Sequence, residues 1–460
     1  MQPSTRDREI FEHAPIMTAI AKLALPTIAG QIILVIYNMA DTFFIGLTGS
    51  DAKLTAVTVC LPAFMILSAI ANLFGVGGAG ETARSLGSGN RTRAGEACAF
   101  SFWGCAALTL FYIAFVLAGR HPLLRLMGAG APDVHRYATV YLAVTVGIGG
   151  LGTAMSMVTA HLFRAEGRSL DASIGIVVGS LLNIALDPLF MFVLLPPGKE
   201  VLGAALATAL SNWISFLIMI GLQIRTRKNT VLVFRSSVRP DAELVRGVLS
   251  TGFPAFLMTL LENISYACLD RLMMANGTAA QAGLGVAKKI NMLAHASVRG
   301  LTQGVLPLIA YNYAAENARR TKQVIRGTVL IAITIGGGCM VACLTLSRPL
   351  VGFFLQPGVS RDVGARFLRI LTIGAPFSAL AYTVISFFQA VERPRKSFLL
   401  AILRKGILDI PMMFLFRLFA PLTGIVAATP AADILCCLTS LVLVMAYSRK
   451  HFPKENRAEG

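Results

Sequence analysis

The sequence predicts an all-α polytopic membrane protein with twelve transmembrane helices, which form two six-helix lobes related by a pseudo-twofold axis. Two observations lead to this prediction. The 460 residues are 55% hydrophobic and only 14% charged, whereas soluble domains carry about a quarter charged residues. In addition, the second half of the chain repeats features of the first half.

The repeat is visible in prolines and small residues that recur at a nearly constant spacing. Ala24-Leu25-Pro26 in the first half is matched by Gly252-Phe253-Pro254 in the second, and Gly77 is matched by Gly304. Internal repeats in a strongly apolar chain are typical of secondary transporters. Two similar halves can rock about a shared axis and expose a central site to each side of the membrane in turn.

Twelve apolar runs are long enough to cross a bilayer, which takes roughly 20 helical residues. Glycine and proline interrupt several of these runs, and helix bundles tolerate such breaks in their interior. In chain order, the predicted helices span residues 16–40, 54–80, 95–119, 136–160, 170–195, 202–224, 246–270, 282–310, 324–347, 366–390, 397–420 and 423–447.

Membrane topology explains the formal net charge of +18 better than nucleic-acid binding does. With the N-terminus in the cytoplasm, the cytoplasmic loops and tails hold about 24 Lys and Arg residues, and the outer loops hold about 11. This positive-inside asymmetry places both termini in the cytoplasm. We therefore expect a monomeric, multi-pass protein of the plasma (inner) membrane that contacts membrane lipid and no nucleic acid.

A basic stretch in the middle of the chain marks the boundary between the halves, with six Lys and Arg residues from Arg225 to Arg246. We expect an N-lobe at 1–224, a cytoplasmic linker at 225–246, and a C-lobe with a short charged tail at 247–460. Because six is an even number, both lobes begin on the same side of the membrane. Their pseudo-twofold axis therefore runs along the membrane normal.

The usual patterns of metal and enzyme sites do not occur in the sequence. The eight cysteines form no CxxC or Cys/His spacing, so we interpret them as small packing residues. No HExxH, GxSxG or P-loop pattern is present. A membrane-embedded prenyltransferase, which is the alternative from another functional class, needs two Asp-rich motifs for Mg²⁺. We therefore expect no cofactor and no enzymatic activity.

Ionisable side chains within apolar runs are costly in a membrane, so each one is a candidate functional residue. Asp41 lies near the end of the first run, and Asp187 lies in the fifth, four residues after Asn183 and on the same helix face. Glu262 lies in the seventh run, eight residues after Pro254. Structural roles stay open for all three acids: an interfacial helix end for Asp41, a capping hydrogen bond for Asp187, and an interhelical polar contact for Glu262.

Other charged residues in the C-terminal half allow more than one interpretation. Asp409 lies within the eleventh run, and we assign it mainly a structural role. Lys288 and Lys289 in the eighth run can extend their ammonium groups toward the membrane surface. Arg299 in the same run can neutralise a buried acid. No role follows for Arg271 at the outer end of the seventh run.

Short motifs are spread over nearly the whole chain, from about residue 15 to 450. They are Pro26, Gln31, Tyr37-Asn38, Asp41 and Gly46 in the first helix, Ala83-Arg84-Ser85-Leu86-Gly87 after the second, Arg164-Ala165-Glu166-Gly167-Arg168 before the fifth, Leu182-Asn183 and Asp187-Pro188 within it, and Gln303-Gly304, Pro307 and Tyr311-Asn312-Tyr313 in the eighth. In these motifs the chain resembles the multidrug and toxic compound extrusion (MATE) transporters. The resemblance is specific because the motifs recur at the family's spacing in both halves.

The resemblance implies drug export in exchange for H⁺ or Na⁺ by alternating access. Family members build an N-lobe cation site from residues that fall here on Asp41, Asn183, Asp187 and Thr208. Two carboxylates in a low-dielectric lobe disfavour double ionisation, so the pair can hold a proton, or Na⁺ with help from the amide and hydroxyl oxygens. Other members use a glutamate that falls on Glu262, together with an acid in the tenth helix. This chain departs from their pattern, because residues 368–389 contain no Asp.

The expected substrates are lipophilic organic cations, which adaptable Met side chains and aromatic faces can bind. We expect Glu262 to favour them with its charge. A lipid-linked oligosaccharide flippase of the same superfamily is the alternative, and its cavity would be basic. Lys288, Lys289 and Arg299 leave this possibility open, and the acids of the first and fifth helices argue against it. The residues expected to line the substrate cavity are Gln31, Tyr37, Asn38, Glu262, Arg299 and Gln303.

Overall fold

The computed structural model describes residues 9–226, 230–232 and 241–451, and within these ranges the chain is helical, without a β-strand. Half of the predicted linker, at 227–229 and 233–240, lies outside the described residues, as does the predicted tail from 452 onward.

The N-terminal half forms the first bundle, the N-lobe. Its elements are the π-helical turn η1 (Glu9–His13), α2 (Ile16–Gly46), α3 (Asp51–Gly87), α4 (Arg91–Ala118), α5 (Arg120–Leu126), α6 (Pro132–Leu142), the π-helical η2 (Ala143–Ile148), α7 (Gly149–Ala165), α8 (Ser169–Pro188), the π-helical η3 (Leu189–Leu194) and α9 (Glu200–Arg225).

The C-terminal half forms the second bundle, the C-lobe. Its elements are α10 (Ala242–Met274), α11 (Thr278–Ala314), α12 (Ala318–Thr345), α13 (Ser347–Gly352), α14 (Val359–Thr372), α15 (Ala375–Ala390), α16 (Pro394–Ile402), the π-helical η5 (Leu403–Asp409), α17 (Ile410–Phe419) and α18 (Thr423–His451).

The duplication extends to the signals that start helices. Asn90 accepts a hydrogen bond from the backbone N–H of Arg93 at the start of α4, and Asn317 accepts one from Arg320 at the start of α12, each at 3.0 Å. Asparagine is favoured at this position because its side-chain oxygen satisfies a free N–H of the first turn. The two caps are related by the same spacing as Gly77 and Gly304.

The prediction of twelve helices in two lobes is confirmed. Nine helices of the described part are long and apolar enough to cross a membrane, and α14 with α15 makes a tenth span that is bent by 42°. The two other predicted spans are the more polar α11 and the interrupted segment α16–η5–α17. The tenth span, predicted as one run at 366–390, bends because Pro376 has no N–H to donate to Thr372.

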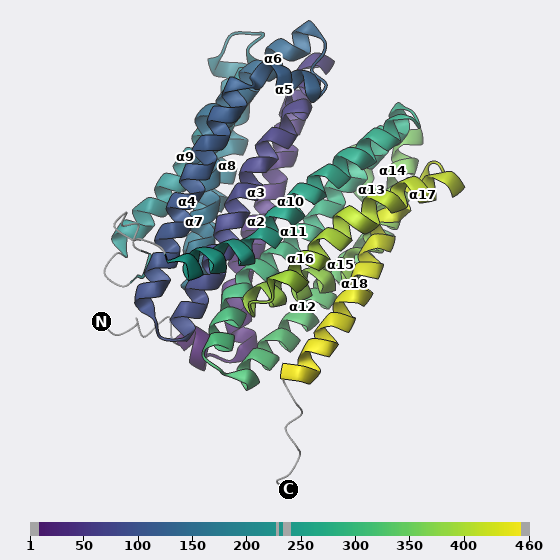
Figure 1. The fold of residues 1–460 in the computed structure, drawn as a ribbon. Coiled ribbons are helices and arrows are strands. Elements are labelled where there is room, and N and C mark those ends of the chain that lie inside the picture. Colours follow the sequence, from purple (N-terminus) through teal and green to yellow (C-terminus); the bar gives the residue numbers. More distant parts are fainter. Residues whose placement is uncertain (1–8, 227–229, 233–240, 452–460) are drawn as a thin grey trace.

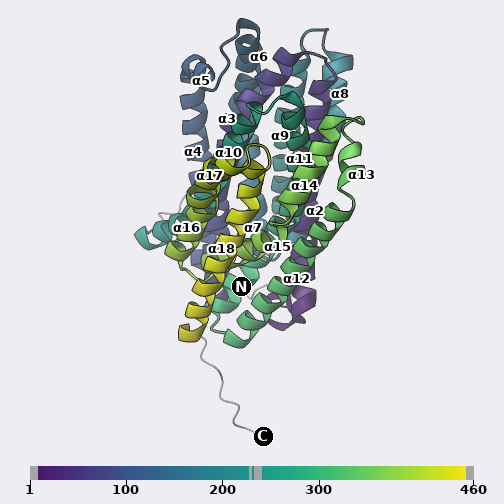
Figure 2. The ribbon, with the colours of Figure 1, turned by 90° about the vertical axis from the view of Figure 1, so that its right-hand side faces the viewer.

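The two bundles diverge toward one end and converge toward the other, where α2 begins and α18 ends (Figure 1). The view turned by 90° shows that the helices of both bundles run roughly along the same long axis (Figure 2). Across the lobe boundary, α3 packs against α10, and α2 packs against α11. These two crossings are equivalent under the repeat, because each joins the first helix of one lobe to the second helix of the other.

Glycines allow the close approach at both crossings. A Cβ at Gly77 would overlap the carbonyl oxygen of Val248, and a Cβ at Gly252 would overlap the carbonyl oxygen of Leu73. Gly304 meets the backbone of α2 in the same way. Small residues permit such backbone contacts between membrane helices, which explains why Gly77 and Gly304 recur in the repeat.

Ion pairs join the lobes at the convergent end. Arg84 of α3 donates a hydrogen bond to Glu81 at 2.7 Å and another to the carbonyl oxygen of Gln389 at 3.4 Å, and its Nε lies 2.9 Å from Glu392. These contacts lie in the last two turns of α3, which extends to Gly87, beyond residue 80 where the apolar run predicted from the sequence stops.

Candidate cation site and central cavity

The N-lobe brings together the four predicted cation-site residues. Asp41 lies near the end of α2, Asn183 and Asp187 lie on α8, and Thr208 lies on α9; α8 packs against both neighbours. Asp187 is fully buried, Asn183 is 1% exposed and Thr208 is 5% exposed. Asp41, on the neighbouring helix α2, lies within electrostatic reach of Asp187 and of Lys289 on α11.

Asn183 links the acids to α9. Its amide nitrogen donates to Asp187 Oδ2 at 3.3 Å, and its amide oxygen accepts a hydrogen bond from the backbone N–H of Thr208 at 3.3 Å. The amide therefore ties Asp187 to α9.

The local sequence shapes the helix around Asp187. Pro188 has no N–H to donate to the carbonyl group of Ile184, and the π-helical segment η3 begins immediately afterwards. π-helical turns within α-helices frequently occur at functional sites. The irregular turn loosens the regular hydrogen bonding next to the buried acid.

Both acids retain capacity to bind a cation. Oδ1 of Asp41 and Oδ1 of Asp187 are buried and have no hydrogen-bond partner among the residues that the structure describes. A buried carboxylate oxygen without a partner is costly, and a proton or a hard cation such as Na⁺ would remove that cost, because hard cations bind oxygen ligands. The donor set therefore fits either predicted coupling ion.

A central cavity lies between the two lobes, with walls contributed by α2, α3, α7, α8 and α9 from the N-lobe and by α10 and α11 from the C-lobe. The structure brings all six predicted cavity residues to its wall, although their role in binding stays a prediction: Gln31, Tyr37, Asn38, Glu262, Arg299 and Gln303. Asn183 also reaches the cavity, so the cation site lies directly beside it.

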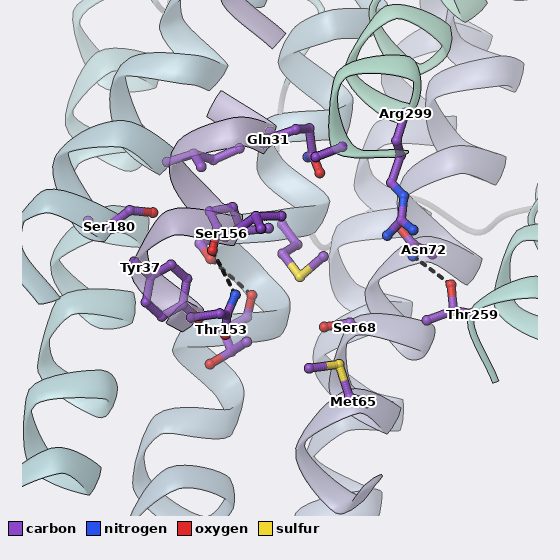
Figure 3. A pocket seen from close by; sticks show the side chains of 18 of the residues that line it. Gln31, Tyr37, Met65, Ser68, Asn72, Thr153, Ser156, Ser180, Thr259 and Arg299 are labelled. Atoms are coloured by element: carbon purple, nitrogen blue, oxygen red, sulfur yellow. Dashed lines mark hydrogen bonds between the residues drawn. The ribbon is translucent and has the colours of Figure 1, made fainter. Parts of the chain in front are cut away.

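Polar side chains cross the cavity from one lobe to the other. Gln31 on α2 donates to Gln303 on α11 at 3.4 Å, and Asn72 on α3 donates to Thr259 on α10 at 3.0 Å. Figure 3 shows Gln31, Asn72 and Arg299 directed into the same space. Such contacts can break and re-form as the lobes move, because each joins helices of different lobes.

Glu262 does not offer the free negative charge that the sequence suggested. Arg299 donates to its Oε2 at 2.9 Å, and the hydroxyl group of Tyr382 donates to its Oε1 at 3.3 Å. The pair lies at the cavity wall and is electrically neutral as a unit. Of the roles weighed for Arg299, neutralising a buried acid is the one that the structure has. Lys288 pairs with Asp270 at 2.6 Å, on the same C-lobe helices.

Sequence reasoning missed a buried charged network in the C-lobe. Lys405 donates to Asp409 at 2.8 Å, and Arg404 donates to Asp433 at 2.7 Å, with all four side chains at most 2% exposed. Asp409 therefore has the structural role expected for it. The repeat could have pointed to the network, because Asp409 lies 222 residues after Asp187, and Pro411 lies 223 residues after Pro188.

Arg164, near the end of α7, is a further cavity residue that the sequence analysis did not select as a site. Its side chain is among the largest that are fully buried, and it contacts the ring of His161 at 3.4 Å. Both residues line the cavity. Within the described ranges, Arg164 forms no ion pair, and its buried Nε has no hydrogen-bond partner.

Comparisons with known proteins agree with this architecture. A model of the MatE family matches residues 26–189 and 254–415, one segment in each half. "Multidrug export protein MepA" of Staphylococcus saprophyticus is 27% identical over 434 residues, which cover 94% of each chain. The protein of the same name from Staphylococcus aureus is 28% identical over 434 residues, again 94% of each chain.

Solved structures share the fold. One is described as the "outward-facing conformation of a multidrug resistance MATE family transporter of the MOP superfamily". It has a TM-score of 0.90 at 22% identity, and the match covers 98% of this chain and 99% of that one. A MOP superfamily transporter from Pyrococcus furiosus, described as having a binding pocket of reverse polarity, has a TM-score of 0.89 at 21% identity and is covered completely, by 98% of this chain.

Proposed function

This chain belongs to the MatE family of multidrug and toxic compound extrusion transporters, and we propose that it exports lipophilic organic cations in exchange for H⁺ or Na⁺. Members of this family are transporters, so the prenyltransferase alternative no longer applies. Relatives that match over almost the whole chain are named multidrug export proteins, which supports drugs as the substrates.

The observation that carries this proposal is the position of the two N-lobe acids. Asp41 and Asp187 have buried, unpartnered oxygens, and their partner Asn183 reaches the wall of the central cavity. An ion at the acids and a drug in the cavity therefore share the helices α2 and α8. Ion binding can shift the packing of these helices and so bias which side of the cavity is open, because a ligand shifts a conformational equilibrium by its differential affinity for the two states.

The cavity wall suits amphipathic ligands. Aromatic faces of Tyr37, Phe64 and Tyr266 and thioether groups of Met65 and Met292 line it. Aromatic faces attract organic cations, and methionine adapts to ligands of different shape. Both properties support a substrate range defined by size and amphipathic character.

The lipid-linked oligosaccharide flippase is the less favoured alternative. Its pyrophosphate carries at least two negative charges and needs a strongly basic cavity. Arg164 and Arg299 line the cavity, but Glu262 neutralises Arg299 at 2.9 Å. Arg164 alone then remains without an acidic partner among the described residues, which is too little positive charge for a diphosphate.

We further propose that the protein works as a monomer in the plasma (inner) membrane, with both termini in the cytoplasm. The excess of basic residues in the loops of one side supports this orientation.

Transport by purified protein in liposomes tests the proposed function. Efflux of a fluorescent organic cation is measured under an imposed pH gradient alone and then under a sodium gradient alone. One of the two gradients is expected to drive accumulation against the concentration gradient. Absence of transport under both gradients, with protein correctly inserted, would contradict the proposal; scrambling of fluorescent diphosphate lipids in the same vesicles would favour the flippase.

A further inference from the structure

The C-lobe contains a buried charged cluster that resembles the proposed N-lobe cation site, with one decisive difference. Asp187 lies near the end of α8, just before the π-helical η3, and Asp409 is the last residue of the π-helical η5, directly before α17. A proline follows in both places, as Pro188 directly after Asp187 and as Pro411 two residues after Asp409. The spacing between the halves is 222 at the acids and 223 at the prolines, so the two acids lie within one residue of equivalent positions in the duplicated helices.

The neighbours of the two acids also correspond. Thr429 falls in the second half where Thr208 falls in the first, and it donates to Asp409 Oδ1 at 3.0 Å. Lys405 stands four residues before Asp409, as Asn183 stands four residues before Asp187. The duplicated site thus keeps its aspartate and its threonine, and it has an ammonium group where the N-lobe has an amide.

The lysine occupies the place of a bound cation. Its Nζ donates to Asp409 Oδ2 at 2.8 Å, and the hydroxyl group of Ser265 donates to the same oxygen at 2.6 Å. Lys405 is 2% exposed and Asp409 is fully buried. Both oxygens of Asp409 are therefore partnered, whereas Oδ1 of Asp187 and Oδ1 of Asp41 have no partner.

The second acid of the N-lobe site has no counterpart in the C-lobe. Asp41 lies as far beyond Pro26 as Leu269 lies beyond Pro254, so Asp41 corresponds to Leu269, which is buried. One carboxylate with one tethered ammonium is electrically balanced, so it needs no further ion. The two N-lobe carboxylates have an ammonium group near them, that of Lys289, which interacts with Asp41, so one negative charge is left for a proton or a metal ion.

We propose that Lys405 is a built-in cation, which permanently fills the C-lobe copy of the site and leaves the N-lobe as the one lobe that exchanges a coupling ion. The inference rests on the proposed N-lobe cation site. It has a direct consequence: replacement of Lys405 by asparagine, the N-lobe residue, opens an exchangeable site for H⁺ or Na⁺ at Asp409, Thr429 and Ser265.

Thermal unfolding of the purified full-length protein tests this consequence. The N-lobe site is first silenced with Asp41→Asn. In this background, the Tm of the Lys405→Asn variant is expected to rise by a few degrees when choline chloride is replaced by sodium chloride, or when the pH is lowered. The reason is that a cation that binds only the folded state stabilises it. The other charged or titratable groups that interact with Lys405 or Asp409 stay unchanged: Arg404, Asp433, Tyr266, Cys268 and Glu262.

Two control variants separate the new site from a general loss of stability. Adding Asp409→Asn is expected to abolish the new cation dependence, because the ligand is then gone. Lys405→Arg is expected to show none, because the tethered charge remains. The proposal would be overturned if the Asp41→Asn/Lys405→Asn variant folds and its Tm depends on cations no more than that of Asp41→Asn.

A transport measurement keeps the proposal testable if Lys405→Asn does not fold. Lys405→Asn/Asp409→Asn removes both charges together, and such neutral replacements of buried ion pairs are often tolerated. We expect this variant to exchange the same number of coupling ions for each exported substrate molecule as the unchanged protein does. A changed number in a monodisperse variant would contradict the inference, whereas failure of the unchanged protein to transport would contradict the proposed function instead.

An independent observation concerns Arg164, the buried cavity arginine without an ion pair in the described part of the chain. Arginine stays protonated in proteins, and an uncompensated buried charge is costly. Glu166, two residues later, receives hydrogen bonds from Thr230 at 2.6 Å and from the backbone N–H of Val231 at 2.5 Å, so it faces the loop after α9. We infer that Arg164 binds a carboxylate carried by the substrate, so that zwitterionic compounds bind better than their cationic esters.

A pair of matched ligands tests this inference without any mutation. A zwitterionic rhodamine free acid and its cationic methyl ester share one fluorophore, and binding of each to the purified protein is followed by fluorescence anisotropy. The acid is expected to bind severalfold more tightly. Equal affinities, or tighter binding of the ester, would overturn the inference and leave the proposed function intact.

Variants then locate the effect. Arg164→Met is expected to remove the preference for the acid and to keep binding of the ester, and Arg164→Lys is expected to keep part of the preference. Arg168→Met is the matched control, because Arg168 lies on the same segment outside the cavity and pairs with Asp171 at 2.8 Å. Competition by acetate or phosphate alone, with equal binding of the two dyes, would assign the site to free anions and contradict the inference.

Discussion

Buried acids in this protein differ in how completely their oxygens are partnered. Asp409 has partners at both oxygens, and Glu262 has Arg299 and Tyr382. Asp41 and Asp187 each retain a buried oxygen without a partner. Only an acid with a vacant oxygen can take up and release an ion at low cost, because the others would first have to give up an existing partner.

Asp41→Asn is expected to reduce drug efflux to the level of cells without the protein. The substitution keeps the size of the side chain and removes the charge that binds the coupling ion. Efflux of ethidium from cells, normalised to the amount of protein in the membrane, measures the effect. Asp51→Asn is the matched control, because Asp51 is an exposed acid at the start of α3. Full efflux by Asp41→Asn at normal expression would contradict the assignment.

Glu262→Gln is expected to weaken efflux of cationic substrates more than of neutral or zwitterionic ones. Arg299 then loses its partner at 2.9 Å and leaves a positive charge in the cavity, which repels organic cations strongly where the dielectric constant is low. Efflux of a cationic, a neutral and a zwitterionic dye is compared in the same cells.

The matched control for Glu262→Gln is a variant that removes both charges of the Glu262–Arg299 pair. Glu262→Gln/Arg299→Gln removes both charges, so efflux of the cationic dye should recover relative to Glu262→Gln alone. Equal losses for all dyes together with loss of the dependence on the driving gradient would show instead that Glu262 carries the coupling ion.

Helix crossings between the lobes are set by glycines at repeat-related positions. At the α3–α10 crossing, Gly77 and Gly252 each face a carbonyl oxygen of the other helix. Backbone atoms cannot move aside as flexible side chains do, so a larger residue at either position must push the helices apart. Because this crossing joins the two lobes, its geometry constrains how they move against each other.

Gly252→Ala is expected to lower the Tm and slow transport, at a cost of about 1–3 kcal/mol, which is typical of overpacking. Alanine otherwise stabilises a helix by about 1 kcal/mol relative to glycine. If the added methyl group had room at this position, the substitution would therefore raise the Tm. Gly338→Ala in α12 is the matched control, since its added Cβ meets no atom within 4 Å. An unchanged or raised Tm for Gly252→Ala would disprove the close crossing.

The two lobes separate toward the end that is remote from the start of α2 and the end of α18 (Figure 1). At the opposite end, the Arg84–Glu392 ion pair joins α3 of the N-lobe to the turn after α15 of the C-lobe. With both termini in the cytoplasm, as we propose, the lobes separate toward the outside and are joined on the cytoplasmic side. An inward-open state would require this inter-lobe ion pair to break.

Accessibility of single cysteines tests this orientation. In a background without the eight native cysteines, Lys199→Cys, in the exposed turn before α9, is expected to react with an impermeant thiol reagent in intact cells. Arg319→Cys, exposed at the start of α12, is expected to react only after the cells are broken. The opposite pattern would invert the topology and contradict the positive-inside argument.

The sequence by itself determined the helices, the duplication and the N-lobe acids. Hydrophobic runs report the membrane spans because the bilayer demands about 20 apolar helical residues, and Asp41 and Asp187 are conspicuous because acids within such runs are rare. These are local properties, which neighbouring residues along the chain largely decide. The apolar run at 366–390 predicted the tenth span, but not the 42° bend within it, which is found between Thr372 and Ala375.

Only the tertiary structure decided which charges neutralise each other. Glu262 and Arg299 lie on different helices, and the charge expected for Glu262 in the cavity depends on the 2.9 Å contact between them. Lys405 and Asp409 share a helix, yet their burial comes from the packing of α10 and α18 around η5. Pairing and burial depend on the rotation and contacts of distant helices, so hydrophobicity and spacing along the chain do not specify them.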